Sequence, residues 1–165
     1  MRFRYIFAPL TALLCSAAAL APVPVDMPFN IPYGMPISME LAKKAVDAAH
    51  AEAIRRNWKM AIAVVSPAGD LTYYLKMDDT QLASADIAPK KARTAARFRR
   101  ESQVFFELME TGHPYVMTLD PEIVTASGGI PIVVGGRLIG AIGCSGGTGA
   151  QDAVVCKVGA DAVSQ

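Results

Sequence analysis

The sequence predicts an α+β domain with a largely antiparallel sheet and helices packed on it. Its 165 residues suit one domain, and a composition of 52% hydrophobic and 19% charged residues suits a globular one. Two strand–turn–strand patterns, at residues 60–77 and 127–145, alternate with segments of helical spacing. Because hairpin strands are antiparallel, this order of α–β–β–α–(α)–β–β–α favours an α+β domain over a doubly wound fold.

The first predicted elements are a helix and a hairpin. Ser38 has the character of an N-cap, and small apolar residues recur at helical spacing as far as Asn57, which predicts a helix over residues 38–56. The apolar run MAIAVV, the turn SPAGD and the run LTYYLKM follow, at residues 60–77. They predict a buried strand, a hairpin turn and its partner strand.

The second half repeats this order. Helical spacing returns over residues 82–99, where Pro89 is expected to bend the helix or to mark its start. A short helix is predicted at 101–110, and TGHPYVMTLDPE, residues 111–122, is expected to be a loop. A second hairpin turns at Gly135-Gly136, a pair that tolerates positive φ, and residues 147–163 form the last helix.

The N-terminal segment has the pattern of a secretory signal peptide. Arg2 and Arg4 precede the uncharged run YIFAPLTALLCSAAALA, which ends in an Ala19-Leu20-Ala21 cleavage pattern. An uncleaved anchor is the alternative, although Pro9 interrupts a run that is already short for a membrane span. We therefore expect a periplasmic or secreted protein with no stable membrane span after cleavage.

This pattern divides the chain into three parts. Five prolines between residues 22 and 36 indicate an extended arm. The predicted organisation is a signal peptide at 1–21, a proline-rich arm at 22–36 and one domain at 37–165.

Charge and cysteine content restrict the partners and the chemistry. Sixteen basic and fifteen acidic residues nearly balance, so no field steers the chain toward nucleic acid. Cys144 lies at a probable strand end, and Cys156 lies about two turns into the next helix. Rise per residue places them around 10 Å apart, which predicts two free buried thiols, although an exported protein could pair them.

The glycine-rich stretch GAIGCSGGTGAQD, residues 140–152, joins the last strand to the last helix. It has no lysine for a Walker loop, and its hairpin context excludes a dinucleotide fingerprint. Two interpretations stay open. The turn is a nest of backbone N–H groups suited to a carboxylate, or it is close backbone packing with Thr148 capping the helix.

Basic and histidine residues supply the other candidates. Lys90, Arg93, Arg97 and Arg100 recur every three or four residues, as expected of a solvated helix face or of a clamp for carboxylates. His50 and His113 are candidate ligands for a metal or heme iron, with a structural role as the alternative. Since no base accompanies Ser145, the catalytic residues are unknown.

Three segments carry a family resemblance: AIAVVSPAGDLTYYLKMDD, KKARTAA and GGIPIVVGGRLIGAIGCSGGTGAQD. Over residues 37–163 the chain resembles the GlcG/HbpS family of heme-binding proteins and is similar to the C-terminal domain of PduO-type proteins. The resemblance implies a profilin-like α+β fold, heme as the cofactor and a homo-oligomer, which in this family is often an octamer.

The sequence thus predicts an exported heme- or tetrapyrrole-binding protein that acts in heme sensing, storage or degradation. The expected contacts are Lys90 and Arg93 for carboxylates, His50 or His113 for iron, and, as site walls, Gly128, Gly129, Ser145, Gly146, Gly147 and Thr148. One alternative is an enzyme or accessory factor for a small hydroxy- or keto-acid, as in glycolate metabolism, held by Arg93 and the glycine turn. Another is an oligomerisation module whose arm latches neighbouring subunits.

Overall fold

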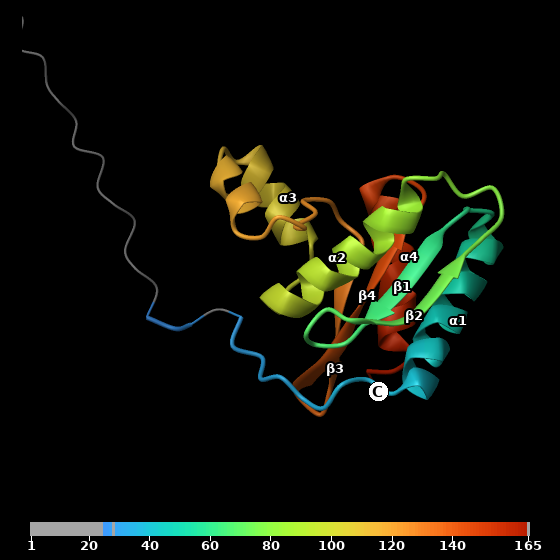
Figure 1. Ribbon diagram of the computed structural model, residues 1–165, viewed down its shortest axis with the longest axis horizontal. Coiled ribbons are helices and arrows are strands. Elements are labelled where there is room, and N and C mark those ends of the chain that lie inside the picture. Colours follow the sequence, from blue (N-terminus) through green and yellow to red (C-terminus); the bar gives the residue numbers. More distant parts are fainter. Residues whose placement is uncertain (1–24, 28, 165) are drawn as a thin grey trace, which may run out of the picture.

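The computed structural model describes residues 25–27 and 29–164, so the predicted signal peptide lies outside the described residues. One four-stranded sheet has the order β2-β1-β4-β3, and every neighbouring pair is antiparallel (Figure 1). The strands are β1 (Ala61–Val65), β2 (Leu71–Lys76), β3 (Gly129–Val134) and β4 (Arg137–Ser145). The predicted α+β class and both hairpins are confirmed.

Helices cover both faces of the sheet. They are α1 (Met39–Arg56), α2 (Ser84–Phe98), α3 (Gln103–Glu110) and α4 (Gly149–Asp161), with a 3-10 helix η1 (Pro114–Thr118). Ile62 and Val64 of β1 pack in one core cluster with α1 and α4, whereas Val65 packs with α2. Figure 1 shows α3 beyond the end of α2, away from the sheet. Among the described helices, none is long and apolar enough to cross a membrane.

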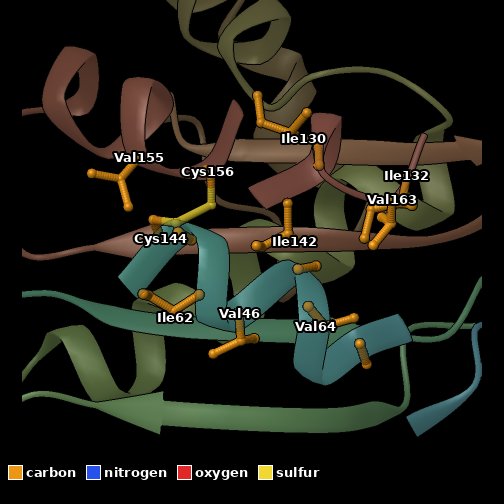
Figure 2. Packing of buried hydrophobic residues seen from close by; sticks show 14 of the residues in the cluster. Val46, Ile62, Val64, Ile130, Ile132, Ile142, Cys144, Val155, Cys156 and Val163 are labelled. Carbon is orange, nitrogen blue, oxygen red and sulfur yellow. A yellow bond between two sulfur atoms is a disulfide. The ribbon is translucent and has the colours of Figure 1, made fainter. Parts of the chain in front are cut away.

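The two faces of the sheet are packed differently. Branched side chains from both hairpins fill the space under α1 and α4, together with two cysteines (Figure 2). Under α2 the residues are small, and a Cβ atom on Gly143 would lie 2.1 Å from the carbonyl oxygen of Ala88. The backbone of α2 therefore lies directly against β4.

The helix boundaries follow local sequence signals. The Ser38 hydroxyl accepts a hydrogen bond from the Leu41 N–H at 3.2 Å, and Asn57 ends α1 in the left-handed conformation, as the sequence predicts. By contrast, α2 begins at Ser84 and continues through Pro89. The expected loop at 111–122 contains η1, which has a proline at its first turn.

The prediction of two free thiols is wrong. Cys144 and Cys156 form a disulfide, with Cα atoms 5.6 Å apart (Figure 2). The chain reverses after β4, so α4 runs back along this strand: Cys156 lies over Cys144, and a Cβ on Gly159 would contact Ile142. The expected separation of around 10 Å between the two cysteines assumed that the helix continues away from the end of the strand, and the reversal of the chain removes this assumption.

The last part of the proline-rich arm pairs with its own chain. Beyond the end of β1, which pairs with residues 141–145, the arm lies along the first half of β4. The Gly34 N–H donates to the Leu138 carbonyl at 2.8 Å, and the Ile37 N–H donates to the Ile139 carbonyl at 2.7 Å. Residues 34–37 are thereby fixed to the sheet ahead of α1.

Candidate functional site

The corner between β4 and α4 uses its backbone N–H groups internally. Thr148 and Gln151 form a capping box, in which the Thr148 N–H donates to Gln151 Oε1 at 2.9 Å. The Gly147 N–H donates to the carboxylate of Asp152 at 3.0 Å. The turn thus does hold a carboxylate, and this carboxylate belongs to the protein itself.

Asp152 is also paired with a buried lysine. The Lys91 ammonium, on α2, lies 2.6 Å from the Asp152 carboxylate, and each side chain is only 3% exposed. Burial raises the pKa of the Asp152 carboxyl above its ordinary value of 3.8, while the Lys91 charge and the Gly147 N–H oppose this rise. This pair could not be predicted from helical spacing, which places Lys90, and not Lys91, on the basic stripe.

Because Gly128 has no side chain, it leaves room for this ion pair. Its φ is 114°, and a Cβ atom there would lie 2.7 Å from the Asp152 Cβ and 3.2 Å from the Lys91 Nζ. A side chain at this position would therefore displace both charged groups. The predicted site residue Gly128 serves the ion pair directly.

The predicted residues Gly129 and Ser145 belong to buried hydrogen bonds. The Ser145 hydroxyl lies 2.9 Å from that of Ser84, and both side chains are buried. The Gly129 N–H donates to the Ser102 hydroxyl at 2.8 Å, and this hydroxyl donates to the Ala126 carbonyl at 2.6 Å. These groups fix the corner from within, and Ser145 is closed to a ligand.

A cleft of about 430 Å³ adjoins this corner, a size typical of small-molecule sites. The side of α3, the loop before β3 and the first turn of α4 enclose it, and its lining residues are Gln103, Phe106, Glu107, Ala126, Ser127, Gly149 and Ala150. Phe106 supplies an aromatic wall, and the N-terminus of α4 gives the opposite wall a positive dipole. The cleft thus combines an aromatic wall, the N-terminus of α4 and the acidic side chain of Glu107.

The basic stripe on α2 already holds carboxylates. The Arg93 guanidinium lies 2.7 Å from the Glu122 carboxylate and donates to the Gly69 carbonyl at 3.2 Å. Arg97 is paired in the same way with Asp120, at 2.6 Å. The segment that contains Asp120 and Glu122 therefore occupies the predicted clamp, whereas Lys90 is half-buried and forms no ion pair with another described residue.

The two histidines lie on different parts of the fold. His50 is half-buried on α1, which covers the sheet face opposite α2, so the sheet separates it from Lys90 and Arg93. His113 is exposed between α3 and η1, with its Nδ1 atom 3.2 Å from the Thr111 hydroxyl. Across the described ranges, no three His, Cys, Asp or Glu residues gather in a way that could hold a metal ion.

The sheet order, the helices on both faces and the cleft beside the glycine corner define a small α+β domain with a candidate ligand-binding cleft. The chain belongs to the family described as "Haem degrading protein HbpS-like", whose model matches residues 37–161. It is 40% identical to Protein GlcG of Escherichia coli K12 over 106 residues, which are 64% of this chain and 78% of that protein. The predicted GlcG/HbpS membership is confirmed.

Solved structures show the same fold. A double mutant of Streptomyces reticuli HbpS matches with a TM-score of 0.74 and 25% identity, over 90% of this chain and 100% of that one. A structure described as the PduOC:heme complex matches with a TM-score of 0.72 and 27% identity, over 78% of this chain and 95% of that one.

Proposed function

We propose that this protein binds heme or a related tetrapyrrole outside the cytoplasm, in heme sensing, storage or degradation. The observation that carries the proposal is the similarity to PduOC, described as a heme complex, over 95% of that chain. Membership in the HbpS-like family over residues 37–161 supports it further.

The surface around α3 and η1 has the side chains that heme needs. Phe106, Tyr115, Met117 and Leu119 are between 44% and 57% exposed there, and they would cover an apolar macrocycle. The His113 ring lies 6.1 Å from that of Tyr115, and its contact with Thr111 through Nδ1 leaves Nε2 for iron. These residues therefore fit heme, which when bound would supply redox-active iron at this surface.

We further propose that His50, Lys90 and Arg93 contact heme. His50 is the second candidate for the iron, on the other side of the sheet. Lys90, and Arg93 after displacement of Glu122, would meet the heme propionates, because guanidinium and ammonium groups pair with carboxylates. The glycine corner would act by fixing α4 and the adjacent cleft.

Export is supported by the disulfide and the N-terminal pattern. The Cys144–Cys156 bond is of a kind that persists in oxidising compartments and is rare in the cytosol. The family model begins at residue 37, which agrees with a signal peptide at 1–21 and an arm at 22–36 preceding the domain. We therefore propose a location in the periplasm or outside the cell.

Hemin titration of the purified protein, followed by the Soret band, tests heme binding. We expect a saturable Soret shift at micromolar protein, with the axial ligand lost in either His113→Ala or His50→Ala. Gln103→Ala, which changes the cleft without touching a histidine, serves as the matched control. A wild-type protein without a Soret shift, or two histidine variants identical to wild type, would contradict the proposal.

A second candidate function is favoured by the cleft itself. Its volume of about 430 Å³ has room for a small hydroxy- or keto-acid, whose carboxylate would lie at the first turn of α4 and which an enzyme or accessory factor would bind. Calorimetry of the heme-free protein with glycolate separates the two functions. Saturable binding that weakens in Ser127→Ala, with no Soret shift by hemin, would favour the acid.

We also propose a homo-oligomer. Leu82 is 87% exposed and Met35, on the arm, is 83% exposed, and apolar side chains this open are often covered by a partner. Light scattering tests it, since a monomer mass at physiological concentration would reject it. A mass that falls when residues 22–36 are removed would assign the arm a role between subunits.

A further inference from the structure

A second hollow lies on the other side of α2, away from the cleft at the glycine corner. This groove is shallow and open to solvent, with a volume of about 400 Å³, and it lies between the N-terminal arm, the turn that joins β1 to β2 and the C-terminal half of α2. Its lining residues are Tyr33, Pro67, Ala68 and Arg97. Three of these residues are apolar or aromatic, and the fourth, Arg97, carries a guanidinium.

The aromatic wall is held in place by α2. The Tyr33 hydroxyl donates to the Arg97 carbonyl at 2.9 Å, across 64 residues of sequence. The guanidinium of Arg99 lies 5.4 Å from the centre of the Tyr33 ring, in a cation–π contact. On either side of Tyr33, the backbone pairs with Leu138 of β4 through Pro32 and Gly34.

The opposite wall is equally fixed. The turn from Ser66 to Asp70 is closed by a hydrogen bond from the Gly69 N–H to the Ser66 carbonyl at 3.0 Å. Arg93 donates to the Gly69 carbonyl at 3.2 Å and so ties this turn to α2. A ligand would enter a groove whose walls are already ordered, which lowers the entropic cost of binding.

The charged group of the groove is oriented and partly free. Arg97 is 47% exposed, while its partner Asp120 is only 9% exposed and holds one edge of the guanidinium at 2.6 Å. A guanidinium has five N–H donors, so donors are left for a second carboxylate. Because Asp120 already balances the charge of Arg97, a second carboxylate would be held by hydrogen bonds from the remaining N–H groups and not by an unbalanced charge.

The groove includes a residue that precedes the part matched by the family model. The family model matches residues 37–161, whereas Tyr33 belongs to the preceding arm. Figure 1 shows this arm passing along one end of the sheet before α1. Tyr33 thus brings the arm into the wall of the groove.

We propose that this groove binds a small monocarboxylate with a flat, apolar body. The ring system of the ligand lies between Tyr33 and the Pro67-Ala68 turn, and its carboxylate accepts hydrogen bonds from Arg97. Neither His50 nor His113 lines this groove, and Arg93, a proposed propionate contact, borders it only through its hydrogen bond to the Gly69 carbonyl.

The test is calorimetric titration of the heme-free protein with 2-naphthoate, with 2-naphthylmethanol as its uncharged counterpart. We expect saturable 2-naphthoate binding to the wild type and binding of the alcohol weaker by about tenfold or more. This comparison uses the unmodified protein and does not depend on the folding of a variant. No saturable binding, or equal binding of the two compounds, would overturn the proposal.

Variants then locate the site. Arg97→Met and Tyr33→Ala should each weaken 2-naphthoate binding about tenfold, whereas Tyr33→Phe keeps the ring and most of the affinity. Arg55→Met is the matched control, because Arg55 is an exposed arginine of α1 that also pairs with a carboxylate. Equal losses in Arg97→Met and Arg55→Met, or none in Tyr33→Ala, would show that 2-naphthoate binds elsewhere and overturn the assignment.

Discussion

The ammonium of Lys91 and the carboxylate of Asp152 lie 2.6 Å apart, and 3% of each side chain is exposed. Lys91 belongs to α2 and Asp152 to α4, which cover opposite faces of the sheet. The pair meets beside Gly128, where β3 begins. It therefore connects the two helical layers at the corner that borders the cleft.

Breaking this pair should cost much of the stability. Asp152→Asn keeps an acceptor for the Gly147 N–H but leaves the Lys91 charge buried and unpaired, which typically costs about 3–5 kcal/mol. The double variant Lys91→Met/Asp152→Asn should recover part of this loss. Urea denaturation of the two single variants and the double variant measures the coupling between Lys91 and Asp152. If the losses in free energy of unfolding of the single variants simply add up to that of the double variant, the two residues are not coupled.

The disulfide should contribute to the stability of the fold in a different way. It joins residues 12 positions apart and restricts the unfolded chain, an effect worth about 3 kcal/mol for loops near this length. We expect oxidised wild type to unfold at higher urea than reduced wild type or Cys144→Ala/Cys156→Ala. Identical midpoints for oxidised and reduced protein would contradict this expectation.

Elements with local signals could be predicted from the sequence. Ser38 and Asn57 mark the ends of α1, and Gly135-Gly136 supplies the two positive φ angles of the second hairpin, 56° and 73°. Thr148 caps α4 as expected. Each signal acts within a few residues, so spacing along the chain was sufficient.

Contacts between distant residues could not be predicted in this way. Lys91 and Asp152 are 61 positions apart, and Arg93 and Glu122 are 29 apart. Their pairing depends on how α2 packs against the sheet, which no local pattern encodes. For the same reason the sequence of the glycine turn did not reveal that its Gly147 N–H donates to Asp152.

Acid should weaken the protein in part through Glu52. Hydrogen bonds from Arg55 and Arg56 lower the pKa of the Glu52 carboxyl from 4.5 to about 2. A carboxyl with a lower pKa in the folded state stabilises folding above its ordinary pKa, and this stabilisation is lost as the pH falls from 4.5 toward 2.

Glu52→Gln isolates this contribution. The difference in free energy of unfolding between wild type and Glu52→Gln should be constant above about pH 5 and should shrink as the pH approaches 2. Urea denaturation at steps of pH measures it, with an NMR titration of the Glu52 carboxyl as the direct check. A carboxyl that titrates near 4.5 would contradict the assigned pairing.

The close approach of α2 to β4 leads to the last prediction. A Cβ atom on Gly143 would lie 2.1 Å from the Ala88 carbonyl oxygen and 2.5 Å from the Ala92 nitrogen, both backbone atoms of α2. Gly143→Ala must therefore push the helix away from the sheet, and overpacking of this kind costs about 1–3 kcal/mol or more.

Gly149→Ala is the matched control, because the nearest atom to its added Cβ would lie 3.4 Å away, at ordinary contact distance. It lies in the first turn of α4, where alanine favours the helix over glycine by up to about 1 kcal/mol. In thermal unfolding, the midpoint temperature of Gly143→Ala should be several degrees lower than that of wild type. The midpoint of Gly149→Ala should equal or exceed that of wild type. Equal midpoints for the two variants would mean that α2 does not lie against the backbone of β4.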